Sequence, residues 1–213
     1  MITLYDYLPS QNGYKVRLLL SHLGCPYRSV LVPIFDGAGQ AQDFLARNPT
    51  GAVPVLELED GLVLPESNAI LGYLAEGTPY LPDDAWARAQ VSRWMYFEED
   101  YIQNGLASLR HWCMTGKLAR RSAEMIAAKR AVSEKTLRLL NQWLAARQFL
   151  TDAGYTIADI SVFAYVSRAH EADLPLSAYP AVDAWVARVR AQPGFLDTVY
   201  PYAIDPKSAQ ELP

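Results

Sequence analysis

The sequence predicts an α/β unit followed by an all-helical unit. Short apolar runs alternate with helical patterns over the first 76 residues, and strand signals nearly vanish after residue 85. Between these regions, Glu76–Asp84 contains one Gly and two Pro, which break regular structure. Alternating strands and helices are typical of a sheet covered by helices, whereas the second region has the pattern of helices packed on helices. We therefore expect one domain at 1–76, a linker at 77–85 and a helical domain at 86–213.

The first region divides into four strands and three helices. Apolar residues at 3.6-residue spacing predict the first helix, which Gly24 ends, with Pro26 just beyond. The second helix stops before Asn48, because a residue that precedes a proline disfavours the α-helical conformation. A turn at 59–61 joins the last two strands. The expected strands are Ile2–Tyr5, Arg28–Val32, Val55–Glu57 and Leu62–Leu64, and the expected helices are Tyr14–Leu23, Ala41–Arg47 and Ala69–Leu74.

Four long helical stretches fill the second region. Pro175 and Pro180 separate the last two stretches, and Pro193 followed by Gly194 stops the final one. We expect the tail Asp205–Pro213 to be loose, as chain ends often are. The expected helices are Ala85–Trp112, Ser122–Ala146, Thr156–Glu171 and Ala181–Gln192.

The composition is that of a soluble globular protein, with 51% apolar and 20% charged residues. A net charge of −4 argues against a nucleic acid partner, because phosphate binding needs a basic surface. We find no apolar run of membrane-spanning length and no secretory signal, so we expect no membrane partner. Cys25 and Cys113 lie far apart without metal-site spacing. We therefore expect no metal and a reducing cytoplasm as the location.

The stretch at 48–56, N-P-T-G-A-V-P-V-L, places a Val53-Pro54 bond between a turn and an apolar run. The trans preference of such a bond is only about 0.5–1 kcal/mol, so a fold holds the cis form at little cost. A cis proline at the head of a strand would turn the preceding backbone N–H and C=O outward, where they would pair with an extended peptide. The alternative is a turn that serves the fold alone.

Glu66 and Ser67 lie between a strand-like run and a helix-like run. The free N–H groups and the dipole of a helix N-terminus bind a carboxylate, and the Glu66 carboxylate would take an ammonium group. Together they form a clamp for the end of a short peptide that carries both charges. The alternative makes Ser67 an N-cap and Glu66 an acid that complements the helix dipole.

Ser10 and Asn12 follow the first strand and precede the first helix. A hydroxyl or amide at this position can donate a hydrogen bond to a thiolate, and helix N-termini lower the pKa of a thiol. Because the thiolate is the nucleophile, this placement would activate a bound thiol. The alternative is that both residues only cap the helix.

Four motifs in this order resemble the soluble glutathione transferase family, most closely its bacterial Ser- or Thr-type members. The resemblance covers nearly the whole chain. It implies an N-terminal thioredoxin-like domain with a mixed four-stranded sheet, and a C-terminal helical bundle. The motifs are 10–17 (S-Q-N-G-Y-K-V-R), 48–54, 66–70 (E-S-N-A-I) and 156–159 (T-I-A-D).

The resemblance assigns roles to the residues of these motifs. Ser10, assisted by Asn12, would stabilise the thiolate of glutathione. The cysteinyl backbone of glutathione would pair with Val53 and Pro54. The carboxylate of its γ-glutamyl part would bind Ser67, and the ammonium group of the same part would bind Glu66. For the glycine carboxylate we expect Gln40, with Lys15 and Arg47 as alternatives.

Some residues that related proteins use for chemistry have no such role here. Related bacterial enzymes carry a Cys in the loop before the first helix, but none lies between Ser10 and Gly13. Other classes of the family use a strand-end Tyr, whereas Tyr5 and Tyr7 fit core packing in an apolar strand. The Thr156–Asp159 motif fits a capping box, so we expect Thr156 and Asp159 to stabilise the fold.

The electrophile should lie against the first long helix of the second domain. Small residues flanked by aromatic ones recur on one helical stripe there and would form a concave floor for an apolar molecule. Ordinary helix packing is the alternative. The stripe consists of Tyr101, Gly105, Ser108 and Trp112.

The resemblance implies a glutathione transferase, a homodimer that uses glutathione as co-substrate in detoxification. The bound thiolate would add to a small electrophile. Peroxidase, dehalogenase and isomerase activities use the same thiolate and stay open. The alternative from another class is a non-catalytic protein of this fold that binds a partner or sequesters ligands, because fold does not fix function.

Overall fold

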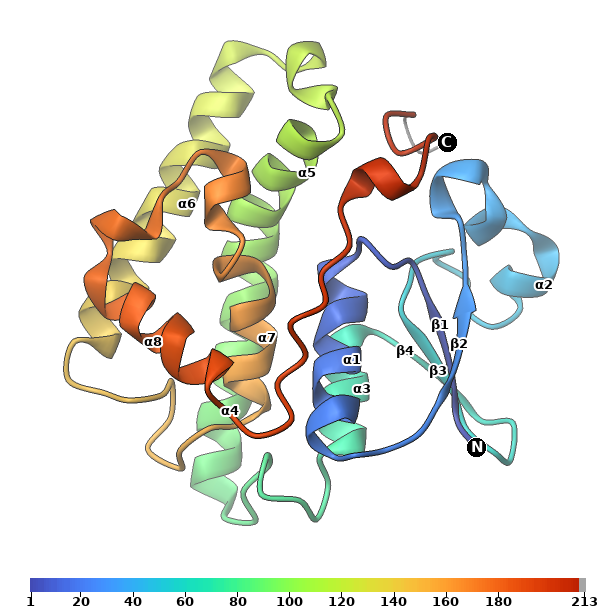
Figure 1. Ribbon diagram of the computed structural model, residues 1–213, viewed down its shortest axis with the longest axis horizontal. Helices are drawn as coiled ribbons and strands as arrows, with labels where there is room; N and C mark the ends of the chain where they lie inside the picture. The colour runs from blue at the N-terminus through green and yellow to red at the C-terminus, as the bar shows by residue number, and fades with distance from the viewer. Residues whose placement is uncertain (211–213) are drawn as a thin grey trace. The chain divides into compact units, whose positions relative to one another are not determined.

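The computed structural model describes residues 1–210, which form two compact units (Figure 1). The first contains Met1–Ala75 together with the C-terminal segment from Pro193 onward, and the second is Glu76–Gln192. The structure thus differs from the expected boundaries in the C-terminal segment, which we had placed in the helical domain.

The first unit contains a mixed four-stranded sheet of the predicted kind. Strand β1 is parallel to β2 and antiparallel to β3, which is in turn antiparallel to β4. The order across the sheet is β2-β1-β3-β4. The strands are β1 Thr3–Asp6, β2 Arg28–Leu31, β3 Val55–Glu57 and β4 Val63–Pro65.

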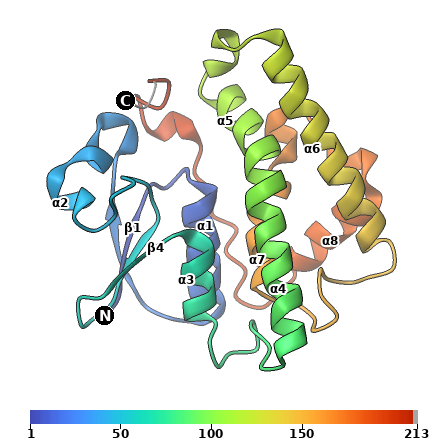
Figure 2. The same cartoon turned by 180° about the vertical axis from the view of Figure 1, so that it is seen from behind.

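The two faces of this sheet bury different clusters, because successive side chains of a strand point to opposite faces. Leu4 packs with apolar residues of α1 (Gln11–His22) and α3 (Ser67–Leu74). Its neighbour Tyr5 packs with Phe44 of the short helix α2 (Gln42–Leu45). Helices α1 and α3 therefore cover one face and α2 lies against the other, as Figures 1 and 2 show.

The C-terminal segment is bound to the first unit along its length. The Ser21 hydroxyl donates to the carbonyl of Gly194 at 2.8 Å, and the Tyr14 hydroxyl donates to that of Leu196 at 2.7 Å. Farther on, Asp205 accepts a hydrogen bond from Tyr7. The expectation of a loose tail is thus wrong for 205–210, and 211–213 lie outside the described residues.

The second unit is helical, as predicted. The expected helix Ala85–Trp112 is instead α4 (Ala85–Phe97), a π-helical segment (Glu98–Ala107) and α5 (Ser108–Met114). Within residues 1–210, no helix combines the length and the apolar character needed to cross a membrane. The remaining α-helices of the unit are α6 (Ala123–Leu144), α7 (Ile157–Val166) and α8 (Pro180–Arg190).

Helix α7 begins with the predicted capping box. Thr156 and Asp159 satisfy each other's backbone N–H groups across the first turn. The buried Asp159 carboxylate also accepts hydrogen bonds from the backbone N–H of Leu150 and from Nε1 of Trp185, at 3.0 and 2.9 Å. One carboxylate therefore joins α7 to the preceding loop and to α8.

This carboxylate predicts a pH dependence of stability. Burial raises the pKa of Asp159 to about 6, although its hydrogen bonds oppose the shift. In the unfolded chain the group titrates near its ordinary value of about 3.9, so between about pH 4 and pH 6 the folded protein retains a proton that the unfolded chain has lost. The contribution of Asp159 to the free energy of unfolding should therefore fall as the pH rises through this window. Urea unfolding of the wild type and of Asp159→Asn at several pH values tests this, because the variant should lack that fall.

Candidate functional site

A cavity of about 290 Å3 in the first unit brings three predicted site residues together. Ser10 comes from the start of α1, Gln40 from the loop before α2, and Val53 from the residues before β3. These positions are distant in sequence, and only the fold places them around one space. The cavity is lined by Ser10, Ile34, Gly39, Gln40, Thr50, Gly51, Ala52 and Val53.

Two glycines allow the loops around this cavity to approach closely. A Cβ on Gly39 would lie 2.3 Å from the carbonyl oxygen of Gly51. Gly51 has φ +69°, a conformation that favours glycine, and a Cβ there would lie 2.5 Å from Nε2 of Gln40. The Gln40 amide is thereby held beside Gly51. In the sequence, Gly51 stands out only as part of the stretch at 48–56.

Asn48 organises the turn that leads to Val53. Its Oδ1 accepts from the backbone N–H and the hydroxyl of Thr50, and its Nδ2 donates to the carbonyl of Ala52 at 2.9 Å. The Val53-Pro54 peptide bond is cis, the form that the sequence analysis gave as possible at this position. The backbone before β3 is therefore fixed by side-chain hydrogen bonds on one side and by the proline on the other.

Ser10 caps α1 and keeps a hydrogen-bond donor. Its Oγ accepts from the backbone N–H of Gly13 at 3.3 Å, which is the cap that the alternative interpretation predicted. A hydroxyl that accepts in this way still carries one O–H to donate. The cap and a role toward a ligand in the cavity are thus compatible. Asn12, which is half-buried, is not among the residues that line the cavity.

A buried ion pair fixes the loop that carries Ser10. Nε of Arg17 lies 3.0 Å from Oδ2 of Asp6, and both side chains are almost fully buried. Arg17 also donates through Nη2 to the carbonyl of Leu8 at 2.8 Å, two residues before Ser10. Burial raises the pKa of Asp6, while the Arg17 guanidinium opposes this shift. A Cβ on Gly13 would lie 1.8 Å from Asp6, so only glycine fits beside this carboxylate.

The Glu66–Ser67 pair lies at the N-terminus of α3, as predicted. Glu66 is exposed and has φ +72°, whereas Ser67 is the first residue of the helix and only 4% exposed. The Oγ of Ser67 accepts a hydrogen bond from Nζ of Lys15 at 3.4 Å. Lys15 is fully buried, and neither it nor Ser67 is among the residues that line the 290 Å3 cavity. This position does not favour Lys15 as a ligand of the glycine carboxylate beside Gln40.

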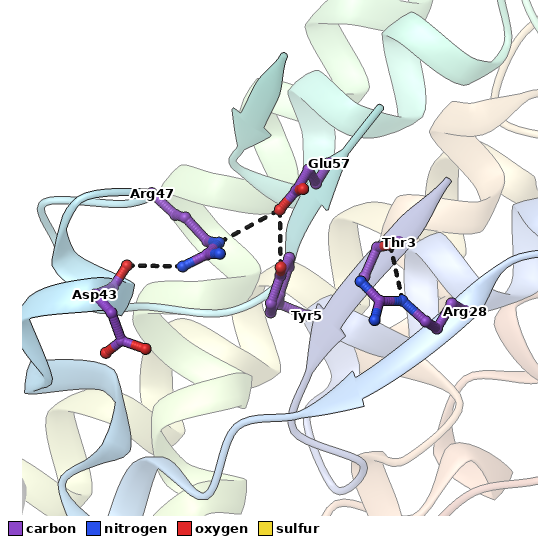
Figure 3. Close-up of polar contacts among 6 residues, drawn as sticks. All are labelled: Thr3, Tyr5, Arg28, Asp43, Arg47 and Glu57. Atoms are coloured by element: carbon purple, nitrogen blue, oxygen red, sulfur yellow. Dashed lines mark hydrogen bonds and ion pairs between the residues drawn. The ribbon is translucent and has the colours of Figure 1, made fainter. Parts of the chain in front are cut away.

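Tyr5 and Arg47 are engaged by Glu57 (Figure 3). The Tyr5 hydroxyl donates to Oε2 of Glu57 at 2.8 Å, and Nε of Arg47 approaches the same oxygen at 3.3 Å. Arg47 also donates to the carbonyl of Asp43. Burial, reinforced by Glu57, raises the pKa of Tyr5. These contacts give Arg47 a structural role beside the inner strands β1 and β3; in the same view, Nε of Arg28 donates to the Thr3 hydroxyl.

Tyr7 is buried, as expected, and its hydroxyl is directed to the C-terminal segment. It donates to Oδ2 of Asp205 at 2.9 Å, and the Tyr7 ring packs against Phe35 and Tyr202. Burial and the Asp205 carboxylate raise the pKa of Tyr7. A hydroxyl with a raised pKa and a carboxylate partner is poorly suited to stabilise a thiolate.

A second cavity, of about 310 Å3, lies under the C-terminal segment in the same unit. Its exposed lining is mostly apolar, and Lys207 forms an ion pair with Asp36 at its edge. Local sequence patterns gave no sign of this cavity, because the C-terminal residues reach it only through the tertiary fold. It is lined by residues 6–9, 31–33, 36 and 204–207.

The residues predicted to form the floor for the electrophile in the second unit, Tyr101, Gly105, Ser108 and Trp112, line neither of the two cavities described above. Gly105 faces α6, where a Cβ would lie 3.0 Å from Val132, so helix packing explains it. Tyr101 is 45% exposed and Trp112 only 9%. The Ser108 hydroxyl donates to the carbonyl of Gln103 in the preceding π-helical segment at 3.0 Å. The π-helical segment contains Tyr101 and Gly105, whereas Ser108 and Trp112 belong to α5.

Both halves of the chain match known protein families. Residues 9–76 match the family described as glutathione S-transferase, N-terminal domain, and residues 85–193 match glutathione S-transferase, C-terminal domain. The disulfide-bond oxidoreductase YfcG of Escherichia coli K12 is 30% identical over 200 residues, which covers 91% of this chain and 92% of that protein.

Solved structures are similar over most of the chain. A glutathione S-transferase from Pseudomonas fluorescens Pf-5 is 37% identical with a TM-score of 0.89, covering 92% of this chain and 97% of that one. A glutathione transferase family member from the same strain, with two glutathione molecules bound, is 26% identical with a TM-score of 0.79, covering 91% and 89%.

Proposed function

Because the chain belongs to the soluble glutathione S-transferase family, we propose that it binds glutathione in its first unit and transfers the thiolate to a small electrophile. The observation that carries this proposal is the cavity that joins Ser10, Gln40 and Val53. The Ser10 hydroxyl would hold a thiol, the Gln40 amide would hold a carboxylate, and the backbone of Val53 just before β3 would hold a peptide backbone.

We assign the cysteinyl and glycine parts of glutathione to groups around this cavity and its γ-glutamyl part to the start of α3. The cysteinyl backbone pairs with Val53 beside the cis Pro54, and the glycine carboxylate accepts from the Gln40 amide. The γ-glutamyl end extends to α3, where free N–H groups and Ser67 take the carboxylate and Glu66 takes the ammonium group. This assignment makes the protein a Ser-type member of the family.

Ser10 is the residue proposed to activate the thiol. Its hydroxyl donates to the sulfur of glutathione, and the N-terminus of α1 adds positive potential, so the thiolate is favoured. The thiolate then attacks the electrophilic carbon. A sulfur–carbon bond forms, and either a leaving group departs with the electron pair or the added electrons take up a proton. Asn12, on the first turn of α1, assists Ser10 in this proposal.

The apolar cavity under the C-terminal segment is proposed to hold the electrophile. The residues that line the two cavities are neighbours in the sequence at two places, Pro9 next to Ser10 and Pro33 next to Ile34, which supports placing the two cavities side by side. An apolar molecule in the second cavity would therefore lie next to the thiolate at Ser10. The protein is further proposed to act as a cytoplasmic homodimer in detoxification.

Calorimetric titration of the purified protein with reduced and with oxidised glutathione tests this function. We expect the reduced form to bind and to react with a generic electrophile. Preferred binding of the oxidised form would favour disulfide chemistry, the activity in the name of the relative YfcG. If neither form binds, the transferase proposal is wrong and a partner-binding role replaces it.

Replacing Ser67 with alanine should weaken the binding of reduced glutathione by about 10- to 100-fold. The variant loses a hydrogen bond to a carboxylate, and such bonds to charged groups contribute about 1.5–3 kcal/mol. The same calorimetric titration measures the change. An affinity equal to that of the wild type would remove the γ-glutamyl clamp from the proposal.

A further inference from the structure

The side chain of Lys15 lies inside the first unit and reaches the start of α3. Lys15 is on α1, its side chain has 0% exposure, and its Nζ is 3.4 Å from Oγ of Ser67. Ser67 is itself only 4% exposed. Burial of a lysine removes the rotamer freedom of a long side chain, so its ammonium group is held in one place.

The chemistry of the two groups fixes the direction of this hydrogen bond. A lysine ammonium carries three N–H donors and no acceptor, so Ser67 has to accept through its oxygen. The proton of the Ser67 hydroxyl is then left for another acceptor. Ser67 is the first residue of α3, where the neighbouring backbone groups of the first turn are N–H donors without intrahelical partners. The acceptor that suits this place is an anion.

We propose that Lys15 is a positioning residue that makes Ser67 a hydrogen-bond donor to the α-carboxylate of the γ-glutamyl group of glutathione. This inference rests on the proposed function, which places that carboxylate at the N-terminus of α3. It gives Lys15 a role at the γ-glutamyl end of the ligand and not at the glycine end. Lys15 acts from behind Ser67 and does not touch the ligand.

A role in packing alone makes a different prediction. Lys15 lies where α1 and α3 pack together, so a structural role would affect every ligand of the first unit equally. A positioning role affects only ligands that carry the α-carboxylate, and only while Ser67 has its hydroxyl. Two comparisons therefore separate the interpretations: one changes the ligand and the other changes Ser67.

The test is a calorimetric titration of Lys15→Met with reduced glutathione and with 4-aminobutanoyl-Cys-Gly, which lacks only the α-carboxylate. Methionine keeps a long unbranched side chain and removes the donors. We expect affinity for glutathione to fall by about 10-fold or more, and affinity for the analogue to stay the same. In the Ser67→Ala background the effect of Lys15→Met should disappear. Equal losses for both ligands, or an undiminished loss without the Ser67 hydroxyl, would overturn the proposal.

Two further variants complete the design. Lys129→Met removes a half-buried lysine of the second unit and should change neither affinity, which controls for the loss of one positive charge. If Lys15→Met does not fold, Lys15→Leu, which also lacks a donor, takes its place with the same expected results. Independently of both, Ser67→Ala has to reduce the wild-type preference for glutathione over the analogue by about 10-fold or more, and an undiminished preference refutes the proposal. Wild-type protein that binds neither ligand refutes the proposed function instead.

Discussion

Replacing Asp159 with alanine is expected to lower the free energy of unfolding by about 3 kcal/mol or more, because three buried donors lose their acceptor. The donors are the backbone N–H groups of Leu150 and Thr156 and Nε1 of Trp185, at 3.0, 3.1 and 2.9 Å from the carboxylate. Each buried donor left without a partner costs about 1–3 kcal/mol. The side chains of Asp159 and Trp185 both have 0% exposure, so water does not replace the lost bonds without a rearrangement.

Urea unfolding of Asp159→Ala measures this loss, and Asp84→Ala is the matched control. Asp84 caps α4 through one hydrogen bond to the backbone N–H of Ala87, and it is exposed. Loss of such a cap costs about 0.5–2 kcal/mol. If Asp159→Ala is no less stable than Asp84→Ala, the buried network does not hold the second unit together.

Replacing Ser10 with alanine is expected to reduce kcat by about 10- to 100-fold while the affinity for glutathione stays nearly unchanged. A hydrogen bond to a charged group contributes about 1.5–3 kcal/mol, and Ser10 makes its proposed bond to the thiolate and not to the groups that anchor the peptide. Steady-state kinetics with a generic electrophile, together with calorimetry, separate the two effects. A loss of affinity without a loss of kcat would show that Ser10 serves binding alone.

Tyr7→Phe is the control for this experiment. Its hydroxyl is directed to Asp205 in the same unit, so its removal should leave kcat largely unchanged. The variant also tests whether any loss in Ser10→Ala is a general effect of removing a hydroxyl near the loop. A large loss of kcat in Tyr7→Phe would point to a tyrosine as the donor.

The sheet of the first unit was predictable because its signals are local. The strand Val55–Glu57 was predicted with its exact bounds, since the proline before it and the turn after it are both visible in the sequence. Helix α1 begins at Gln11, three residues earlier than the periodicity of its apolar residues indicated. The reason is the cap by Ser10, whose short polar side chain satisfies the first turn before the apolar pattern starts.

The features that the sequence did not predict depend on tertiary contacts. The hydrogen bond between Tyr7 and Asp205 joins residues 198 positions apart, so no local pattern reports it. The close approach of Gly39 and Gly51, which holds the Gln40 amide beside Gly51, likewise depends on the fold and not on a local pattern. In the second unit, Gly105 packs closely against Val132 of α6, a contact that the residue spacing along its own helix does not report.

The most direct test of the central claim, that Ser10 stabilises the thiolate of bound glutathione, is an ultraviolet titration of that thiolate. We expect the pKa of the thiol bound to the wild-type protein to lie below the value of about 8.5 for a free thiol. In Ser10→Ala it should rise toward that value, and in Tyr7→Phe it should stay low. A bound thiol that titrates at the same pH in the wild type and in Ser10→Ala would contradict the claim and leave Ser10 as a helix cap.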